Sequence, residues 1–472
     1  MNDFHTPDWV KHAVFYQIFP DRFANGDPTN DPANVQPWGT PPTPHNFMGG
    51  DLQGILQKLG YLQELGITAI YLNPIFQATS NHRYNTYDYF RIDPKLGTME
   101  DFQSLVQEMH RRGMRLILDG VFNHCGRGFY AFHDVVENGK HSPYVGWFHI
   151  KRFPIFPYDG LKKANYESWW GIRSLPKFNT DNPQVRQFLL SVARYWIEQG
   201  ADGWRLDVPN EIDDDAFWRE FRQVVKSANP DAYIVGEIWK DAKRWLQGDQ
   251  FDAVMNYPLR DLCVEFLAKG TMDAPAFATK LTRLFRRYPS EATYALLNLL
   301  GSHDTARWLT VCGNDVRRAM LGYTLLFTLP GAPCIYYGDE IGMTGEADPH
   351  CRACFEWDRR KWNRRLYQHV RALIALRKSS TAWRTGALEV LCAEANVLAY
   401  ARWDAADAFV VIINNSQRRW EGVIPLRKRS LPPVAALQDV QNGETVIPRG
   451  RVVRMSVSPY SHRVLQAKQG CG

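Results

Sequence analysis

The chain has 472 residues, of which 45% are hydrophobic and 22% charged, so it is long enough for roughly three domains and too apolar to be disordered. Its 56 basic and 50 acidic residues leave a net charge of only +6, and no Lys/Arg run indicates a nucleic-acid patch. No stretch reaches the ~18 consecutive apolar residues of a membrane span. We therefore expect no nucleic-acid and no membrane partner.

The cysteine pattern and the N-terminal residues favour a cytoplasmic protein. Eight cysteines are scattered singly, apart from Cys351 and Cys354. This usage is typical of reduced thiols, and the C-x-x-C pair has no second pair beside it, so structural thiols are favoured over a metal or redox site. Residues 1–11 lack the apolar run of a signal peptide.

One pattern recurs eight times along the chain. A short apolar run ends in polar residues, and in most cases a segment with helical spacing follows. The predicted strands lie, in chain order, within residues 14–20, 67–74, 115–123, 203–208, 233–239, 251–257, 294–304 and 332–340. Predicted helices between them cover residues 52–65, 99–112, 182–199 and 216–227.

Near-continuous apolar strands that alternate with helices are typical of a parallel sheet buried on both faces. Eight such units predict an α/β fold, a (β/α)8 TIM barrel. An eight-stranded doubly wound sheet is the second choice, although no glycine-rich phosphate turn follows the first strand.

Two segments depart from a plain barrel. Residues 124–180 form too long a connection for a βα loop and are rich in Gly, Pro and aromatics, which predicts a subdomain inserted after strand 3. From residue 385 onwards, short alternating runs at 397–403, 409–414 and 452–457 predict a C-terminal all-β sandwich domain, 385–472. The barrel itself is expected to comprise residues 1–123 and 181–384.

Polar side chains gather at the carboxyl ends of the predicted strands, which face one cavity in a barrel. Three of them are the carboxylates Asp207, Glu237 and Asp304, and Arg205 lies two residues before Asp207. A lone Asp at a strand end is usually a helix cap, but three carboxylates on one rim favour chemistry. Paired carboxylates suit acetal cleavage, in which one attacks the anomeric carbon and the other protonates the leaving oxygen.

These motifs resemble those of the α-amylase family of retaining glycoside hydrolases over essentially the whole chain. The segment DGVFNH, 119–124, is similar to the family's third-strand motif. By the same resemblance, the segment GWRLDV, 203–208, implies that Asp207 is the nucleophile. The segment GEIW, 236–239, implies that Glu237 is the acid/base. SHD implies that Asp304 is the third carboxylate, which binds the 2- and 3-hydroxyls of the sugar.

The resemblance also implies a set of substrate contacts. Tyr84 matches the aromatic that stacks on the sugar at the cleaved bond, and His124 and His303 match histidines that hydrogen-bond the same sugar. The implied substrate-binding residues are Tyr84, His82, His124, Arg205, Glu211, Trp239, His303, Asp348 and Arg352.

Within the family, three segments resemble the neopullulanase, cyclomaltodextrinase and maltogenic amylase subgroup. They are LPKFN at 175–179, VPNE at 208–211 and DPHCR at 348–352. The resemblance implies α-1,4-glucosidic bond hydrolysis in cyclomaltodextrins and maltooligosaccharides, with pullulan and starch as further candidates and transglycosylation as a side reaction. The partners are then α-glucan oligosaccharides.

Three features depart from that subgroup. The first predicted strand begins near residue 14, which leaves no room for the subgroup's N-terminal β-domain, so a monomer becomes an alternative to the usual dimer. Lys240 stands where the subgroup often has His, and Pro209 replaces a small residue.

Residues 25–31 (NGDPTND) form a candidate cation site. With Gly49 and Asp51 they supply the hard oxygen ligands that calcium takes, but a loop of Asx turns explains the same spacing. The resemblance favours a structural Ca²⁺ held by Asn25, Asp27, Asn30, Asp31, Gly49 and Asp51.

Other functions stay open at this point. One is a non-catalytic barrel that only binds glucan, and another is a general α-amylase or α-glucosidase acting on linear substrates. A third is a metal-dependent barrel enzyme with Asp119, His124, Glu237 and His303 as ligands. Trp169 and Trp170 are either a sugar platform or the core of the inserted subdomain, and the core interpretation is slightly favoured.

Overall fold

The computed structural model describes residues 4–159, 163–426 and 434–468. Residues 160–162 of the predicted inserted subdomain, and 427–433 and 469–472 of the predicted C-terminal domain, lie outside the described residues. The chain divides into two compact units. The first comprises Met1–Asp8, Phe15–Met255 and Arg352–Phe355, and the second comprises Trp9–Val14, Asn256–Cys351 and Glu356–Gly472.

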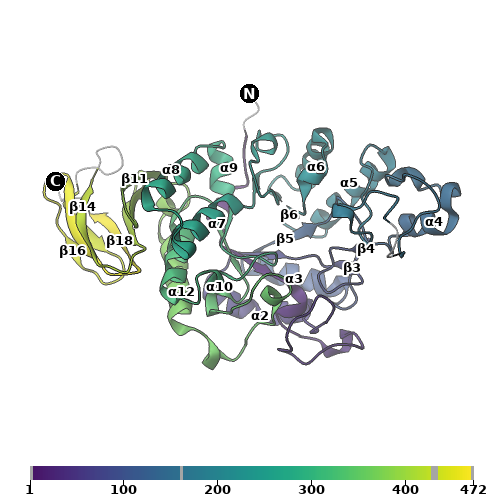
Figure 1. Ribbon diagram of the computed structural model, residues 1–472, viewed down its shortest axis with the longest axis horizontal. Helices are drawn as coiled ribbons and strands as arrows, with labels where there is room; N and C mark the ends of the chain where they lie inside the picture. Colours follow the sequence, from purple (N-terminus) through teal and green to yellow (C-terminus); the bar gives the residue numbers. More distant parts are fainter. Residues whose placement is uncertain (1–3, 160–162, 427–433, 469–472) are drawn as a thin grey trace. The chain divides into compact units, whose positions relative to one another are not determined.

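The first unit is built around parallel strands (Figure 1). They are β1 (Phe15–Ile18), β2 (Ala69–Leu72), β5 (Arg115–Gly120), β6 (Gly203–Leu206), β7 (Tyr233–Gly236) and β8 (Ala253–Val254). They pair side by side in the order β8-β7-β6-β5-β2-β1. Nearly every residue in them is buried, which explains their continuous apolar character.

Four helices of this unit begin at capping side chains. They are α2 (Leu52–Leu65), α3 (Met99–Arg111), α5 (Pro183–Glu198) and α6 (Asp215–Ala228). Asp51, Thr98, Asn182 and Asp214 each accept a hydrogen bond from a backbone N–H of the first turn. The predicted helices therefore form within two residues of their expected bounds.

Two further elements of the first unit extend from strand ends. An antiparallel hairpin of β3 (Phe76–Ala78) and β4 (Thr86–Ile92), which the sequence pattern did not predict, follows β2. The stretch between β5 and α5 contains α4 (Tyr130–Asn138) and an aromatic core of its own. In that core Phe132 lies 5.0 Å from both Phe148 and Tyr166, measured between ring centroids.

The second unit contains the remaining parallel strands, β9 (Leu297–Leu299) and β10 (Ala332–Tyr336), which pair with each other. Its helices are α1 (Asp8–His12), α7 (Tyr257–Cys263), α8 (Ala274–Phe285), α9 (Ser290–Ala295), α10 (Trp308–Val311), α11 (Val316–Thr328) and α12 (Arg364–Ser379). Eight parallel strands that alternate with helices in the described part of the chain confirm the predicted (β/α)8 class.

The C-terminal part of the second unit is all-β, as predicted. A six-stranded antiparallel sheet has the order β11-β12-β13-β18-β15-β16, and β14 pairs with β17. The strands are β11 (Ala387–Glu394), β12 (Val397–Trp403), β13 (Ala408–Asn414), β14 (Trp420–Pro425), β15 (Ala436–Asp439), β16 (Thr445–Val446), β17 (Val452–Val457) and β18 (Ser461–Lys468). Side chains of both sheets share one core that includes Val410, Leu465, Ile424 and Val457.

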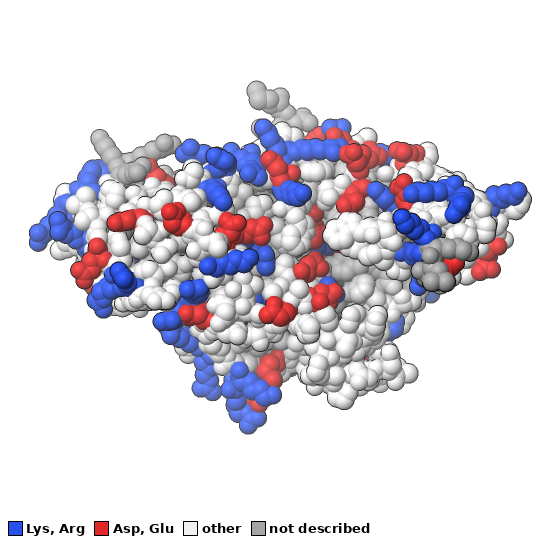
Figure 2. Space-filling view, viewed as in Figure 1, with Lys and Arg blue, Asp and Glu red and all other residues white. Residues whose placement is uncertain are grey.

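The surface carries both signs of charge. On the face shown in Figure 2, acidic and basic side chains are interspersed, in keeping with the nearly balanced composition. Among the described residues, no helix is long and apolar enough to cross a membrane. No disulfide joins the seven cysteines that the structure describes.

Candidate active site

Asp207 and Glu237 follow directly on two neighbouring strands. In the register of β6 and β7, Leu206 pairs with Gly236, so the two acidic residues leave the sheet side by side at its carboxyl edge. Their backbones continue the parallel pattern, since Asp207 N donates to Gly120 O at 3.0 Å and Glu237 N donates to Leu206 O at 2.9 Å. Both residues are nearly buried, 8% and 4% exposed.

The fully buried guanidinium of Arg205 connects three carboxylates. Its Nη1 lies 2.8 Å from Asp119 Oδ1 and 3.1 Å from Asp207 Oδ1. Its Nη2 lies 3.0 Å from Glu237 Oε1, an ion pair whose N–H is not aligned for a hydrogen bond. Burial alone would lower the pKa of Arg205, but Asp119 and Glu237 raise it well above its ordinary value. A permanent positive charge therefore sits between the acidic groups.

Asp119 positions a second set of side chains around the two acidic residues. Its Oδ2 accepts hydrogen bonds from the hydroxyls of Tyr71 at 2.6 Å and Tyr84 at 2.7 Å. Asn73 Nδ2 donates to the Tyr84 hydroxyl at 2.9 Å. Burial raises the pKa of Asp119, whereas Arg205 and the two hydroxyls favour its ionised form. These contacts hold the ring of Tyr84 at the carboxyl edge of the sheet.

Two histidines flank Tyr84. Its backbone N–H donates to His82 Nδ1 at 3.1 Å, and its carbonyl lies 3.2 Å from His124 Nε2. Burial lowers the pKa of His82 to about 3, with Arg352 and Arg83 adding to the effect. Burial likewise lowers the pKa of His124 to about 4. Both imidazoles are therefore neutral near pH 7 and can donate one hydrogen bond and accept another.

The carboxylate of Glu237 is held by two groups besides Arg205. The backbone N–H of Val208 donates to Oε2 at 3.1 Å, and the indole N–H of Trp239 donates to Oε1 at 3.1 Å. Val208 has φ +36°, a left-handed conformation that a β-branched residue before proline rarely adopts. Its strained backbone therefore aims an N–H at Glu237, and the sequence pattern did not predict this role.

The remaining predicted residues fall into two groups. In the first unit, Lys177 Nζ donates to the carbonyl of Glu211 at 2.7 Å, and the Arg352 guanidinium lies over the ring of Phe19 at 5.4 Å. His303, Asp304 and Asp348 belong to the second unit. There, His303 Nε2 lies 3.2 Å from Asp304 Oδ2, and the Cys351 thiol donates to the His303 carbonyl at 3.2 Å.

Tyr71, Asn73 and Val208 are contacts that sequence reasoning missed. Tyr71 and Asn73 lie on and just after β2, which gives a weak signal: polar atoms at the carboxyl end of an otherwise apolar strand. Val208 carries no such signal, because its contribution is a backbone N–H.

The interpretation of Trp170 as core is wrong. Trp170 is 77% exposed, and its backbone has a left-handed conformation with φ +48°. Trp169 is only partly buried and lies between Trp170 and His124.

The predicted calcium ligands come together in two subsets. Asn25 Nδ2 donates to both Asp31 oxygens, at 2.9 and 3.1 Å. The backbone of Gly49 lies close to the same carboxylate, since a Cβ on Gly49 would lie only 2.1 Å from Asp31 Oδ1. Asp51 instead accepts from the backbone of Gly26, Asp27 and Gly54 and from Asn30 Nδ2, so its oxygens already face donors.

One observation in this loop fits a cation. The buried Oδ1 of Asn30 has no hydrogen-bond partner among the described residues, and an amide oxygen is a ligand that calcium accepts. The residues suited to hold a cation are therefore Asn25, Asn30 and Asp31 rather than Asp51. The described residues, those of this loop included, contain no group of three or more His, Cys, Asp or Glu side chains arranged to hold a metal.

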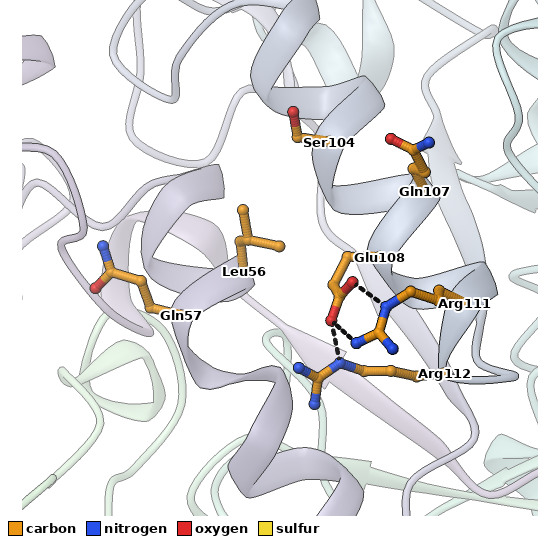
Figure 3. A pocket seen from close by; sticks show the side chains of 7 residues that line it. All are labelled: Leu56, Gln57, Ser104, Gln107, Glu108, Arg111 and Arg112. Carbon is orange, nitrogen blue, oxygen red and sulfur yellow. Dashed lines mark hydrogen bonds and ion pairs between the residues drawn. The ribbon is translucent and has the colours of Figure 1, made fainter.

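A separate groove lies on the helices rather than at the strand ends. Between α2 and α3, residues Leu56, Gln57, Ser104, Gln107, Glu108, Arg111 and Arg112 line an open hollow of about 940 Å³ (Figure 3). Glu108 accepts hydrogen bonds from Arg111 Nε at 2.6 Å and Arg112 Nε at 2.7 Å. Both arginines are engaged by the single carboxylate of Glu108, and the hollow lacks the pair of carboxylates that the chemistry needs, so we do not place the reaction there.

Comparisons with known proteins place the chain in a family. The family model described as the catalytic domain of alpha amylase matches residues 17–371. A cyclomaltodextrinase from Geobacillus thermopakistaniensis is 51% identical over 97% of this chain and 77% of its own length. Neopullulanase 2 from Thermoactinomyces vulgaris is 44% identical over 98% of this chain and 79% of its own length.

A solved structure resembles the protein over nearly its whole length. Cyclic α-maltosyl-(1→6)-maltose hydrolase from Arthrobacter globiformis, in complex with cyclic α-maltosyl-(1→6)-maltose, is 45% identical with a TM-score of 0.91. The match covers 98% of this chain and 100% of that one. With a family model that spans most of the chain and relatives this similar, the protein belongs to the α-amylase family of glycoside hydrolases, in the subgroup of cyclomaltodextrinases and neopullulanases.

Proposed function

We propose that the protein hydrolyses α-1,4-glucosidic bonds in cyclomaltodextrins and maltooligosaccharides with retention of configuration. One observation carries this proposal: Asp207 and Glu237 leave adjacent strands and bind the same guanidinium, that of Arg205. A retaining mechanism needs the two carboxyl groups about 5–5.5 Å apart, and side chains that leave adjacent strands and contact one guanidinium are compatible with such a separation.

In the first step, Asp207 attacks the anomeric carbon while Glu237 protonates the glucosidic oxygen, and a covalent glycosyl-enzyme forms. Glu237, now ionised, then takes a proton from water, whose oxygen attacks the same carbon and releases Asp207. When a sugar hydroxyl replaces the water, the product is a transglycosylated glucan. Arg205 favours an ionised Asp207 at the start of each cycle because its charge lies 3.1 Å from Oδ1.

The other predicted residues are proposed to hold the substrate. Neutral His82 and His124 hydrogen-bond the hydroxyls of the sugar at the cleaved bond, and Tyr84 stacks on its ring. Asp304 and His303 bind hydroxyls of that sugar, and Asp348 and Arg352 contact its neighbour. Glu211 and Trp239 contact the acceptor sugar, and the Lys177 contact to the Glu211 carbonyl supports a fixed position for that residue.

Parallel incubations test the function. We expect β-cyclodextrin to be opened rapidly, with maltose and glucose as products, and pullulan and starch to be attacked more slowly. Preferential attack on starch would instead indicate a general amylase for linear substrates. Cyclic α-maltosyl-(1→6)-maltose belongs in the same series because a 45% identical structure is named for its hydrolysis.

Variants of the two carboxylates test the mechanism. We expect Asp207→Asn and Glu237→Gln each to lower kcat by several orders of magnitude with an unchanged circular dichroism spectrum. The reason is that each variant removes a group that forms or breaks a covalent bond to the reacting atoms. Near-normal hydrolysis by either variant would contradict the assignment.

A structural calcium ion is proposed for the loop at residues 25–31. Asn25, Asn30 and Asp31 would hold it, and the ion would tie this loop to the backbone near Gly49. We expect EDTA to lower the melting temperature and calcium, but not magnesium, to restore it. The variant Asp31→Asn should abolish this response, and a melting temperature that ignores EDTA would exclude the site.

A cytoplasmic location is also proposed. The lack of disulfides among the seven described cysteines supports it, because thiols stay reduced in that compartment. Fractionation of the source cells would test it, and activity confined to the medium would contradict it.

A further inference from the structure

Three aromatic rings form a stack that runs from the candidate active site to the solvent. The ring of His124 lies 5.6 Å from that of Trp169, with 25° between their planes. Trp169 lies 4.7 Å from Trp170, with only 12° between the planes. His124 is 1% exposed and Trp170 is 77% exposed, so the stack leads from a buried ring to an open one.

The outermost ring is held in place by an unfavourable backbone. Trp170 has φ +48° and ψ +26°, in the left-handed region that residues with a Cβ avoid. Exposure of most of an indole to water is a second unfavourable feature. Burial of Trp170 in a core does not offset the free-energy cost of the left-handed backbone or of the exposed ring. A residue kept in place despite both costs favours a role in binding.

Polar atoms beside the stack also lack partners. The indole nitrogen of Trp169 and the hydroxyl of Ser168 are buried, and neither makes a hydrogen bond to any described residue. An unpaired buried N–H or hydroxyl is unfavourable, so a ligand that supplies hydrogen-bonding groups here is favoured. Sugar hydroxyls both donate and accept.

The inner end of the stack identifies the occupant. His124 contacts the Tyr84 carbonyl through Nε2, and the Tyr84 hydroxyl donates to Asp119, which binds Arg205. The stack therefore starts among the residues that surround the two catalytic carboxylates. A chain of glucose units bound there can continue towards Trp170, whose flat uncharged face suits the C–H face of a pyranose.

We propose that the exposed face of Trp170 is a binding site for a glucose unit of a long or cyclic α-glucan, remote from the bond that is cleaved. This inference rests on the proposed function, since the sugar on Trp170 belongs to the same chain that reaches Asp207. Trp169 acts as a positioning residue that holds Trp170 by ring stacking. The site should therefore affect long substrates and leave short ones nearly unchanged.

Hydrolysis of a short and a long substrate tests the site. We expect Trp170→Ala to raise KM for maltoheptaose about three- to tenfold, the effect of losing one aromatic contact, and to leave kcat unchanged. Kinetics with maltotriose should change less than about twofold, since a short chain gains little from a remote contact. Trp170→Phe should keep most of the affinity. Ile447→Ala should leave the kinetics of both substrates unchanged, because this exposed residue, which follows β16, is not part of the stack.

Binding without turnover separates this proposal from the proposed function. In the Asp207→Asn background, calorimetry should show that Trp170→Ala weakens maltoheptaose binding by a similar factor, with an unchanged melting temperature. An equal loss for maltotriose and maltoheptaose, or no loss for either, would overturn the site. If the wild type hydrolyses neither glucan, the proposed function fails, and weaker maltoheptaose binding by Trp170→Ala would still support the site. No binding by the wild type would overturn it.

Discussion

Arg205 organises the candidate site at the scale of single residues. It comes from the middle of β6, while Asp119 lies on β5 and Glu237 follows β7, so one side chain connects three neighbouring strands. Removing two or more charges from water is costly, and a buried ion pair often contributes little net stability. We infer that the contacts are kept because they position Asp207 and Glu237.

The hydroxyl of Tyr71 provides a test at this scale. Tyr71→Phe should lower the free energy of unfolding by about 1.5–3 kcal/mol, because the hydroxyl donates to the buried carboxylate of Asp119. Tyr89→Phe is a matched control: Tyr89 is also buried, but its hydroxyl donates at 2.8 Å to the neutral carbonyl of His124, so the loss should be smaller. Urea unfolding of both variants checks the order, and equal losses would contradict a charged Asp119.

At the scale of elements, α2 depends on Asp51 for more than its first turn. The Asp51 carboxylate caps the helix at Gly54 N and also accepts from Gly26 N and Asp27 N, which fixes the loop before it. Thr98 caps α3 within a capping box, and its contacts stay within that turn.

This difference predicts unequal effects of removing the two caps. Thr98→Ala should cost about 0.5–2 kcal/mol, the usual value for a helix cap. Asp51→Ala should cost clearly more, because two further backbone N–H groups lose their acceptor. Thermal unfolding in EDTA measures both without any contribution from calcium, and equal losses would mean that the loop at residues 25–31 is not held by Asp51.

At the scale of the molecule, the second unit joins helices to the C-terminal sheets through buried basic groups. Arg402, on β12, donates to the carbonyls of Gly386, Ala387 and Thr328 rather than to a carboxylate. His369 on α12 and His462 on β18 meet with ring centroids 4.9 Å apart. Burial lowers the pKa of His369 to about 4 and that of His462 to about 3.

These two histidines predict a pH dependence of stability. Between pH 6.5 and about 4 the unfolded chain binds protons at these positions and the folded protein does not, so unfolding becomes easier as pH falls. The stabilisation is fully present above pH 6.5 and is lost progressively below it. The double variant His369→Gln, His462→Gln should have a melting temperature that falls less steeply between pH 7 and pH 4.5. A slope equal to that of the wild type would exclude this origin.

Several parts of the fold and site followed from local pattern. The apolar runs predicted the barrel strands because strands buried on both faces need continuous apolar side chains. Helix α2 has its predicted bounds, since its cap Asp51 and its terminal Gly66, with φ +100°, are local signals. The placement of Asp207 and Glu237 at one edge followed from the parallel alternation of strands and helices. The domain boundaries stay predictions.

Other parts needed the folded chain. The β3–β4 hairpin has a three-residue strand and irregular register, which is too little for a periodic signal. The role of Val208 lies in a backbone conformation that the proline after it disfavours, so only surrounding structure can impose it. The partners of Asp119 come from residues 35 to 86 positions away, and sequence distance does not encode them.

By itself, the sequence determined which residues could do the chemistry and which strand ends would present them, because alternation of apolar runs and helices is a short-range property. Only the tertiary structure decided that one guanidinium joins three carboxylates, that a strained N–H reaches Glu237, and that Trp170 faces water. Those outcomes depend on strand register and on backbone torsions, which are set by packing across the whole unit rather than by neighbours along the chain.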